Sequence, residues 1–204
     1  MAIRAVIFDL GGVLYITPSL TWARRWQAVM GLKDDPFIAS ILSSPEQSEF
    51  VNDIMIGKIP ESEVMEMAAR RWKISPALFT RFRRGALSSR RWNKELASFV
   101  ESLRPRYKTA ILSNAGSDAR QTFSQHYKID RLVDDVIISA EEKIAKPDER
   151  IYRIAVDRLG VQPEESIFVD DLLPNVEAAR RFGMKAVHFL NTAQTMAAVQ
   201  DYLN

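Results

Sequence analysis

The sequence predicts an α/β protein with a parallel sheet and a helical insert. Short β-branched runs alternate with helical patterns over much of the chain, as is typical of parallel strands joined by helices. The alternation is interrupted after the first run by residues 16–92, which contain helical patterns alone. Because parallel strands end at the same edge of a sheet, we expect any ligand site to lie at their carboxyl ends.

The first predicted strand is the apolar run at residues 4–9, which is continuous and β-branched, as expected of a strand buried on both faces. It ends at Asp9, and Gly11 and Gly12 allow the chain to turn sharply just after it. Four later runs have the same character and are bounded by turn residues or helical patterns: 108–113, 135–138, 166–170 and 185–189.

Helical periodicity and helix-stop residues account for most of the remaining chain. Between and after the later strands they predict helices over residues 117–127, 148–159, 174–182 and 192–203. Within the insert they predict helices at 19–30, 35–42, 46–56, 61–72 and 76–84, and no convincing strand. We therefore expect a core domain made of residues 1–15 and 93–204, and a small helical-bundle cap made of residues 16–92.

Composition describes an ordinary globular chain. Its 204 residues are 47% hydrophobic, which is enough for a packed core, and its net charge of +2 does not favour nucleic acid as a partner. No apolar stretch approaches the roughly 20 residues of a membrane span. The chain has no Cys and enters its first strand without a signal-peptide pattern. We expect a cytoplasmic monomer or homodimer with no nucleic-acid or membrane partner.

Reactive side chains gather at the predicted strand ends. Each has an ordinary structural explanation when taken singly, such as a helix cap or a surface charge. Their coincidence at one edge of the sheet is hard to explain by packing, and it indicates a functional site. Together with Asp9, the side chains concerned are those of Ser113, Asn114, Lys146, Asp170, Asp171 and Asn175.

The order and types of these residues resemble the haloacid dehalogenase superfamily. The matching segments are FDLGGVL, ILSNAG, AKP and IFVDDLLPN, which cover the chain from end to end. The resemblance implies a Rossmann-like sheet of order 5-4-1-2-3 with Asp9 on the central strand, and it identifies the insert as the smaller cap type. The branch that looks most similar includes sugar-phosphate phosphatases and the N-terminal domains of soluble epoxide hydrolases.

The resemblance also implies roles for individual residues. Asp9 would attack a phosphoryl group to form an aspartyl-phosphate. Mg²⁺ would be held by Asp9, by the backbone carbonyl of Gly11 and by Asp171. Around this centre, Lys146 would offset negative charge and Ser113 with Asn114 would donate hydrogen bonds to the transferring oxygens, while Asp170 and Asn175 would orient waters or Lys146.

Two residues that follow the first motif are expected at the entrance of the site. Tyr15 and Thr17 come directly after the glycine turn. They are candidates for contact with the substrate or for a substitute proton donor.

One position departs from the usual phosphatase pattern. The second aspartate, a general acid and base worth about 10² to 10⁴ in rate, is replaced by Gly11. Three functions stay open: a slow phosphatase of small phosphorylated metabolites, a 2-haloacid dehalogenase-type hydrolase, and a non-catalytic or regulatory protein. The acidic pair Asp170-Asp171 favours the metal-dependent phosphatase. If the acid is simply absent, Gly11→Asp should raise the activity.

Overall fold

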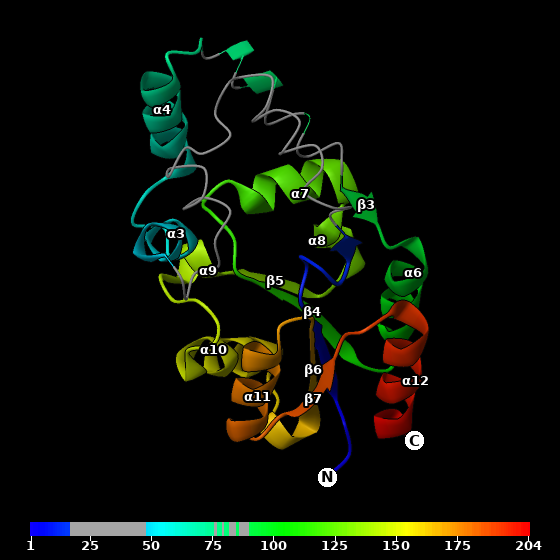
Figure 1. The fold of residues 1–204 in the computed structure, drawn as a ribbon. Helices are drawn as coiled ribbons and strands as arrows, with labels where there is room; N and C mark the ends of the chain where they lie inside the picture. Colours follow the sequence, from blue (N-terminus) through cyan, green and yellow to red (C-terminus); the bar gives the residue numbers. More distant parts are fainter. Residues whose placement is uncertain (17–47, 76, 79, 82–84, 86–89) are drawn as a thin grey trace.

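The computed structural model describes residues 1–16, 48–75, 77, 78, 80, 81, 85 and 90–204 (Figure 1). The helices predicted at 19–30 and 35–42 lie outside the described residues, as does Thr17, and those predicted at 46–56 and 76–84 lie partly outside them.

A five-stranded parallel sheet forms the centre of the fold. Its order is β5-β4-β1-β6-β7, with the strand that precedes Asp9 in the middle. When only the strands of this sheet are numbered along the chain, the order is 3-2-1-4-5, which is the expected order 5-4-1-2-3 seen from the other edge. The strands are β1 (Ala5–Phe8), β4 (Lys108–Ser113), β5 (Asp135–Ile138), β6 (Ser166–Asp170) and β7 (Lys185–His188).

Helices cover both faces of this sheet, so that β1 is entirely buried (Figure 1). Val6 and Phe8 point into one hydrophobic cluster, and Ala5 and Ile7 point into another. The first cluster packs under α6 (Lys94–Leu103), α7 (Ala119–Tyr127), α8 (Ile129–Leu132) and α12 (Thr192–Leu203). The second packs under α10 (Glu149–Leu159) and α11 (Leu173–Arg181).

The described part of the insert contains α3 (Glu49–Met55) and α4 (Glu61–Trp72), in agreement with two predicted helices. The prediction of no strand there was wrong, because β2 (Tyr15–Ile16) pairs antiparallel with β3 (Arg91–Trp92). A strand of two residues is too short to show the alternation of apolar and polar residues from which strands are predicted. This pair lies at the predicted domain boundary, but the division into core and cap stays a prediction.

Four further elements were not predicted from the sequence. They are α6, α8, α9 (Ser139–Glu142) and the 3₁₀ helix η1 (Pro163–Glu165). The signals of α6 were present: the Asn93 side chain accepts a hydrogen bond from the Leu96 amide as an N-cap, and buried apolar residues recur at helical spacing. None of the described helices is long and apolar enough to span a membrane.

Candidate active site

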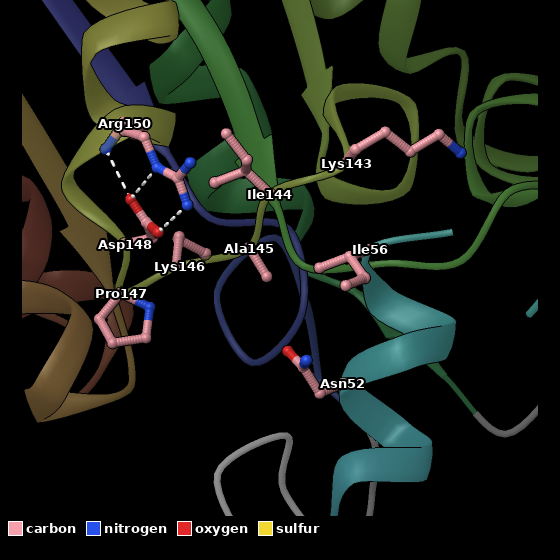
Figure 2. Close-up of a pocket in the computed structure, with 9 residues that line it drawn as sticks. All are labelled: Asn52, Ile56, Lys143, Ile144, Ala145, Lys146, Pro147, Asp148 and Arg150. Carbon is pink, nitrogen blue, oxygen red and sulfur yellow. Dashed lines mark hydrogen bonds and ion pairs between the residues drawn. The ribbon is translucent and has the colours of Figure 1, made fainter. Parts of the chain in front are cut away.

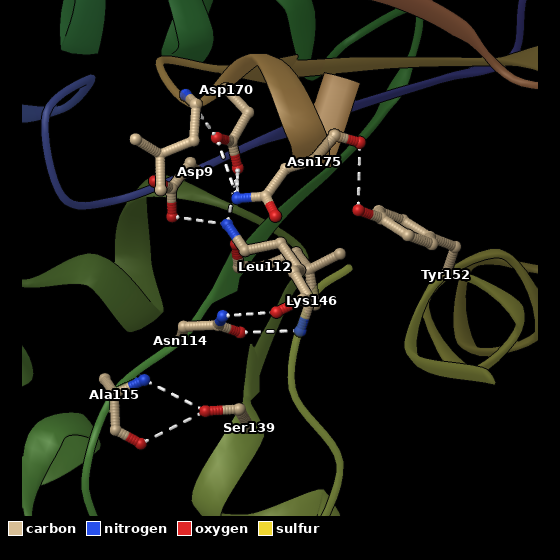
Figure 3. A network of polar contacts seen from close by, with 10 residues as sticks. Asp9, Leu112, Asn114, Ala115, Ser139, Lys146, Tyr152, Asp170 and Asn175 are labelled. Carbon is tan, nitrogen blue, oxygen red and sulfur yellow. Dashed lines mark hydrogen bonds and ion pairs between the residues drawn. The ribbon is translucent and has the colours of Figure 1, made fainter. Parts of the chain in front are cut away.

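The Lys146 ammonium lies at the centre of the polar cluster at the carboxyl end of the sheet (Figure 3). Its Nζ is 2.8 Å from Asp9 Oδ1 and 2.6 Å from Asp170 Oδ2, and it donates a third hydrogen bond, of 3.0 Å, to the Leu112 carbonyl. All three charged side chains are buried, with residue exposures of 3%, 7% and 0% for Lys146, Asp9 and Asp170. All three N–H donors of the ammonium are thus hydrogen-bonded to buried partners.

Burial and charge set the protonation of this cluster. Burial raises the pKa of Asp9 to about 7, Lys146 opposes the rise, and the neighbouring Asp170 adds to it. Burial alone would lower the pKa of Lys146, but the carboxylates of Asp170 and Asp9 outweigh it and hold that pKa above its ordinary value. The lysine is therefore a permanent cation, whereas the ionised form of Asp9 is disfavoured by burial and a further cation would stabilise it.

Asp170 is an organising residue whose two oxygens are fully engaged. The Asn175 amide nitrogen donates to both of them, at 3.0 and 3.2 Å, and the Leu172 amide donates to Oδ1 at 2.8 Å. The Tyr152 hydroxyl in turn donates to the backbone carbonyl of Asn175 at 2.9 Å (Figure 3). The predicted supporting residues Asp170 and Asn175 therefore hold the lysine and the start of α11 in place.

Ser113 and Asn114 lie at the end of β4, as predicted. Asn114 pairs with the backbone of Lys146: its Nδ2 donates to the Lys146 carbonyl and its Oδ1 accepts from the Lys146 amide, both at 2.8 Å. Ser113 is buried, and its hydroxyl makes no hydrogen bond with any described residue. Asn114 thus has a structural task that the sequence did not suggest, while Ser113 keeps its donor for a ligand.

The two glycines of the first motif make room for two different side chains. Gly12 has φ +78°, and a Cβ there would lie 2.1 Å from Asp171 Oδ2, so only glycine lets this carboxylate approach the turn. A Cβ at Gly11 would lie 3.1 Å from the Tyr15 hydroxyl oxygen. The turn is therefore in close contact with Asp171, which follows β6, and with Tyr15, which lies at the far end of the turn itself.

Three carboxylates could receive a metal ion. Each of Asp9, Asp170 and Asp171 offers an oxygen within 4.8 Å of the others. The oxygens of Asp170 are already occupied, so Asp9 and Asp171 are the residues with free ligand capacity. Burial and the adjacent Asp170 raise the pKa of Asp171, because both make the ionised form of this carboxyl less favourable. Clustered carboxylate oxygens suit a hard divalent cation such as Mg²⁺, so the residues present fit that ion.

Several contributors had no obvious sequence signal. His188 ends β7, and its Nε2 lies 3.0 Å from the backbone carbonyl of Asp171. Its position at the end of a predicted strand was the sequence feature that could have indicated this contact. Ser139 is fully buried, accepts from the Ala115 amide at 3.0 Å and donates to the Met55 carbonyl at 2.6 Å, which ties α3 to the site loop. Long-range pairs of this kind leave no pattern in a sequence.

A pocket of about 320 Å³ adjoins the cluster at Lys146 and lies between α3 and the loop that precedes α10 (Figure 2). Asn52 of α3 and Ile56 just after it line one side, and residues 143–148 and Arg150 line the other. Its lining does not include Asp9, Asp170 or Asp171. Its charged walls are partly neutralised, because Arg150 pairs with Asp148 at 2.6 Å. The chemistry therefore belongs to the carboxylate cluster rather than to this pocket.

A sequence model of haloacid dehalogenase-like hydrolases matches residues 3–183. The chain belongs to this hydrolase family. A predicted HAD-like family hydrolase from Porphyromonas gingivalis has the same fold, with a TM-score of 0.81, 27% identity and coverage of 100% of this chain and 99% of that one. A HAD family enzyme from Bacteroides thetaiotaomicron, solved in complex with magnesium and inorganic phosphate, has a TM-score of 0.76 at 18% identity over 92% and 94% of the two chains.

Relatives of this HAD-like hydrolase carry different activities in their names. It is 27% identical to a sesquiterpene phosphatase from Aspergillus oryzae over 94% of this chain and 92% of the relative. It is 28% identical to acyl-CoA dehydrogenase family member 10 of Mus musculus over 97% of this chain, but spans only 18% of that protein. It is 41% identical to (S)-2-haloacid dehalogenase 4A of Burkholderia cepacia over 40% of this chain and 35% of the relative.

Proposed function

We propose that this HAD-like hydrolase is a Mg²⁺-dependent phosphatase of small phosphorylated metabolites, such as sugar phosphates, and that it works through an aspartyl-phosphate on Asp9. The observation that carries the proposal is the contact of Asp9 with Lys146 beside the clustered carboxylates of Asp170 and Asp171. Three carboxylates around one ammonium suit a divalent cation, and that cation would allow an anionic phosphoryl group to approach Asp9.

Asp9 is presented as a nucleophile. Lys146 fixes one of its oxygens at 2.8 Å, while Oδ2 makes no hydrogen bond with any described residue and is free to attack phosphorus. Attack forms the Oδ–P bond and breaks the bond between phosphorus and the leaving oxygen, and water then hydrolyses the acyl phosphate. The Ser113 hydroxyl is available to donate to a transferring oxygen.

The metal would be held by Asp9, the Gly11 carbonyl and Asp171. When bound, Mg²⁺ offsets the combined negative charge of the phosphoryl group and the acids. Burial and the neighbouring Asp170 raise the pKa values of Asp9 and Asp171, and this supports the assignment because a bound cation would stabilise both carboxylates in their ionised form. The magnesium and phosphate complex of the Bacteroides relative is consistent with it.

The dehalogenase alternative is less well supported by the charges of the site. A 2-haloacid carries its own carboxylate, and Asp170 and Asp171 would repel it next to Asp9. The partial identity to the Burkholderia dehalogenase nevertheless makes this the activity to test beside phosphatase.

The test is a panel of sugar and other metabolite phosphates and p-nitrophenyl phosphate, each with Mg²⁺ and with a chelator, beside 2-chloropropionate. We expect phosphate release that needs Mg²⁺, and its loss in Asp9→Asn. Asp157→Asn, which changes an exposed acid on α10, is the matched control and should keep full activity. Chloride release without metal would instead identify a dehalogenase, and the absence of both reactions would leave the regulatory function.

A further inference from the structure

The Tyr15 hydroxyl lies next to the position from which the missing second aspartate would extend. Its oxygen lies 3.1 Å from the position of a Cβ on Gly11, and the ring carbon that bears it lies at 3.5 Å. A Cβ at position 11 would therefore be in tight contact with this hydroxyl. In this chain a different polar group thus lies beside the position of the absent acid.

The turn itself brings Tyr15 back over Gly11. The Tyr15 amide donates to the Leu10 carbonyl at 2.9 Å, and the Gly12 amide donates to the Tyr15 carbonyl at 2.8 Å. These bonds close residues 10–15 into a compact loop whose last residue faces the second one. The backbone thus brings Tyr15 close to Gly11, and the contacts of its ring fix where the hydroxyl lies.

Phe123 and Arg90 both contact the aromatic ring of Tyr15. Phe123 of α7 stacks on it at a centroid distance of 5.0 Å, and the Arg90 guanidinium lies 4.7 Å from its centroid. Arg90 forms no ion pair with any described residue, so among these its cation is directed at the Tyr15 and Phe123 rings. Arg90 and Phe123 therefore act as positioning residues for the Tyr15 hydroxyl.

The hydroxyl is available as a donor. It makes no hydrogen bond with any residue that the structure describes, although the residue that carries it is partly buried. Burial and the nearby carboxylates of Asp9 and Asp171 raise the pKa of Tyr15, against the effect of Arg90, which keeps the phenol protonated. A fixed, protonated hydroxyl beside the nucleophile has the chemistry of a donor to an oxygen that gains negative charge.

We propose that the Tyr15 hydroxyl replaces the absent aspartate by donating a hydrogen bond to the leaving-group oxygen. The inference rests on the proposed phosphatase function. As the Asp9 Oδ–P bond forms, the leaving oxygen departs with the electron pair of the P–O bond, and Tyr15 stabilises the charge that develops on it. The alcohol takes its proton from water, so the tyrosine is unchanged at the end of the step.

This role changes the expectation for Gly11→Asp. The substitution alone places a Cβ 3.1 Å from the Tyr15 hydroxyl oxygen, so the hydroxyl must shift from its position as a donor and activity should not rise. In Tyr15→Phe the nearest ring carbon stays at 3.5 Å from that Cβ, an ordinary contact. The aspartate should therefore help only when the hydroxyl has been removed.

The experiment compares p-nitrophenyl phosphate, whose leaving group needs little help, with phenyl phosphate and glycerol 2-phosphate, whose leaving groups need more. We expect Tyr15→Phe to lower kcat/KM by about 10²-fold on the two poorer substrates and by much less on the first. The loss should appear in kcat with KM unchanged. Tyr127→Phe, which removes a hydroxyl further along the same aromatic stack, should change none of the three.

The double variant Gly11→Asp/Tyr15→Phe should recover part of the rate on phenyl phosphate, whereas Gly11→Asp alone should not. An equal effect of Tyr15→Phe on all substrates, or no effect, would overturn the role of Tyr15 while leaving the phosphatase function intact. A wild-type protein that hydrolyses none of the phosphates with Mg²⁺ would overturn the proposed function and this inference with it. Thermal unfolding of each variant checks that the fold is retained.

Discussion

Asn114 and Lys146 are joined by two reciprocal hydrogen bonds of 2.8 Å, between the amide side chain of the first and the backbone of the second. The pair connects the end of β4 to the loop before α10, two segments that are distant in sequence. It fixes the backbone from which the lysine reaches Asp9 and Asp170. The precision of the charged cluster therefore depends on a residue that touches none of the carboxylates.

We expect Asn114→Ala to lower kcat/KM by about 10- to 100-fold, because misplacing a catalytic group by a fraction of an ångström is costly. It should also lower the free energy of unfolding by about 1–3 kcal/mol, since backbone groups of Lys146 lose their partners. Asn191→Ala is the control: it removes the α12 N-cap, where Oδ1 accepts from the Gln194 amide at 2.9 Å, at a cost of about 1 kcal/mol. Equal activity of the two variants would contradict the positioning role.

Lys146→Met should destabilise the protein by about 3–5 kcal/mol, because it leaves the fully buried Asp170 and the buried Asp9 without their cation. Denaturant unfolding measures the change. Lys143→Met, at an exposed lysine three residues earlier, should stay within about 0.5 kcal/mol. Adding Asp170→Asn to Lys146→Met should recover part of the lost stability, and no recovery would show that charge pairing is not the cause.

Gly12→Ala should weaken Mg²⁺ binding as well as stability. Its Cβ would collide with Asp171 Oδ2, so the carboxylate must move away from the turn, in addition to the strain of the positive φ. Gly160→Ala has nearly the same strain, with φ +66° and no atom within 4 Å of the new Cβ. This control should cost about 1–2 kcal/mol and leave the Mg²⁺ affinity unchanged. Calorimetric titration with Mg²⁺ distinguishes the two, and unaltered affinity in Gly12→Ala would exclude Asp171 as a ligand.

Mg²⁺ affinity should rise with pH up to about 7 and then level off. The pKa of Asp9 is raised from 3.8 to about 7 by burial, so the metal-free protein carries a proton that the ion must displace. The same shift means that the folded state holds more protons than the unfolded state between these values. The stability of the metal-free protein that comes from Asp9 is thus present below about pH 4 and is lost as the pH rises through 7.

Unfolding curves and Mg²⁺ titrations across pH 5 to 8 check both halves of this prediction. Asp9→Asn lacks the titrating group, so the fall in metal-free stability attributed to Asp9 should disappear in that variant. An Mg²⁺ affinity of the wild-type protein that does not change with pH would show that Asp9 is already ionised in the metal-free state.

The sequence by itself determined the sheet and the composition of the site. Buried parallel strands read as continuous apolar runs, and polar side chains at their carboxyl ends must share one edge, so Asp9, Lys146 and Asp170 could be placed together before any distance was known. Five helices were also found to within two residues at each end, namely α4, α7, α10, α11 and α12, whereas α6 was missed despite its apolar period. Motif order then supplied the family and the expected strand order.

Only the tertiary structure decided which contacts those residues make. The pairing of Asn114 with Lys146, the lodging of Asp171 against Gly12 and the position of the Tyr15 hydroxyl over Gly11 depend on where separate loops end in space. The sequence showed that position 11 has glycine instead of an acid, but it did not show which residue lies next to that glycine. Periodicity reports how one segment is buried, whereas the chemistry of a site follows from distances between segments that the local sequence does not encode.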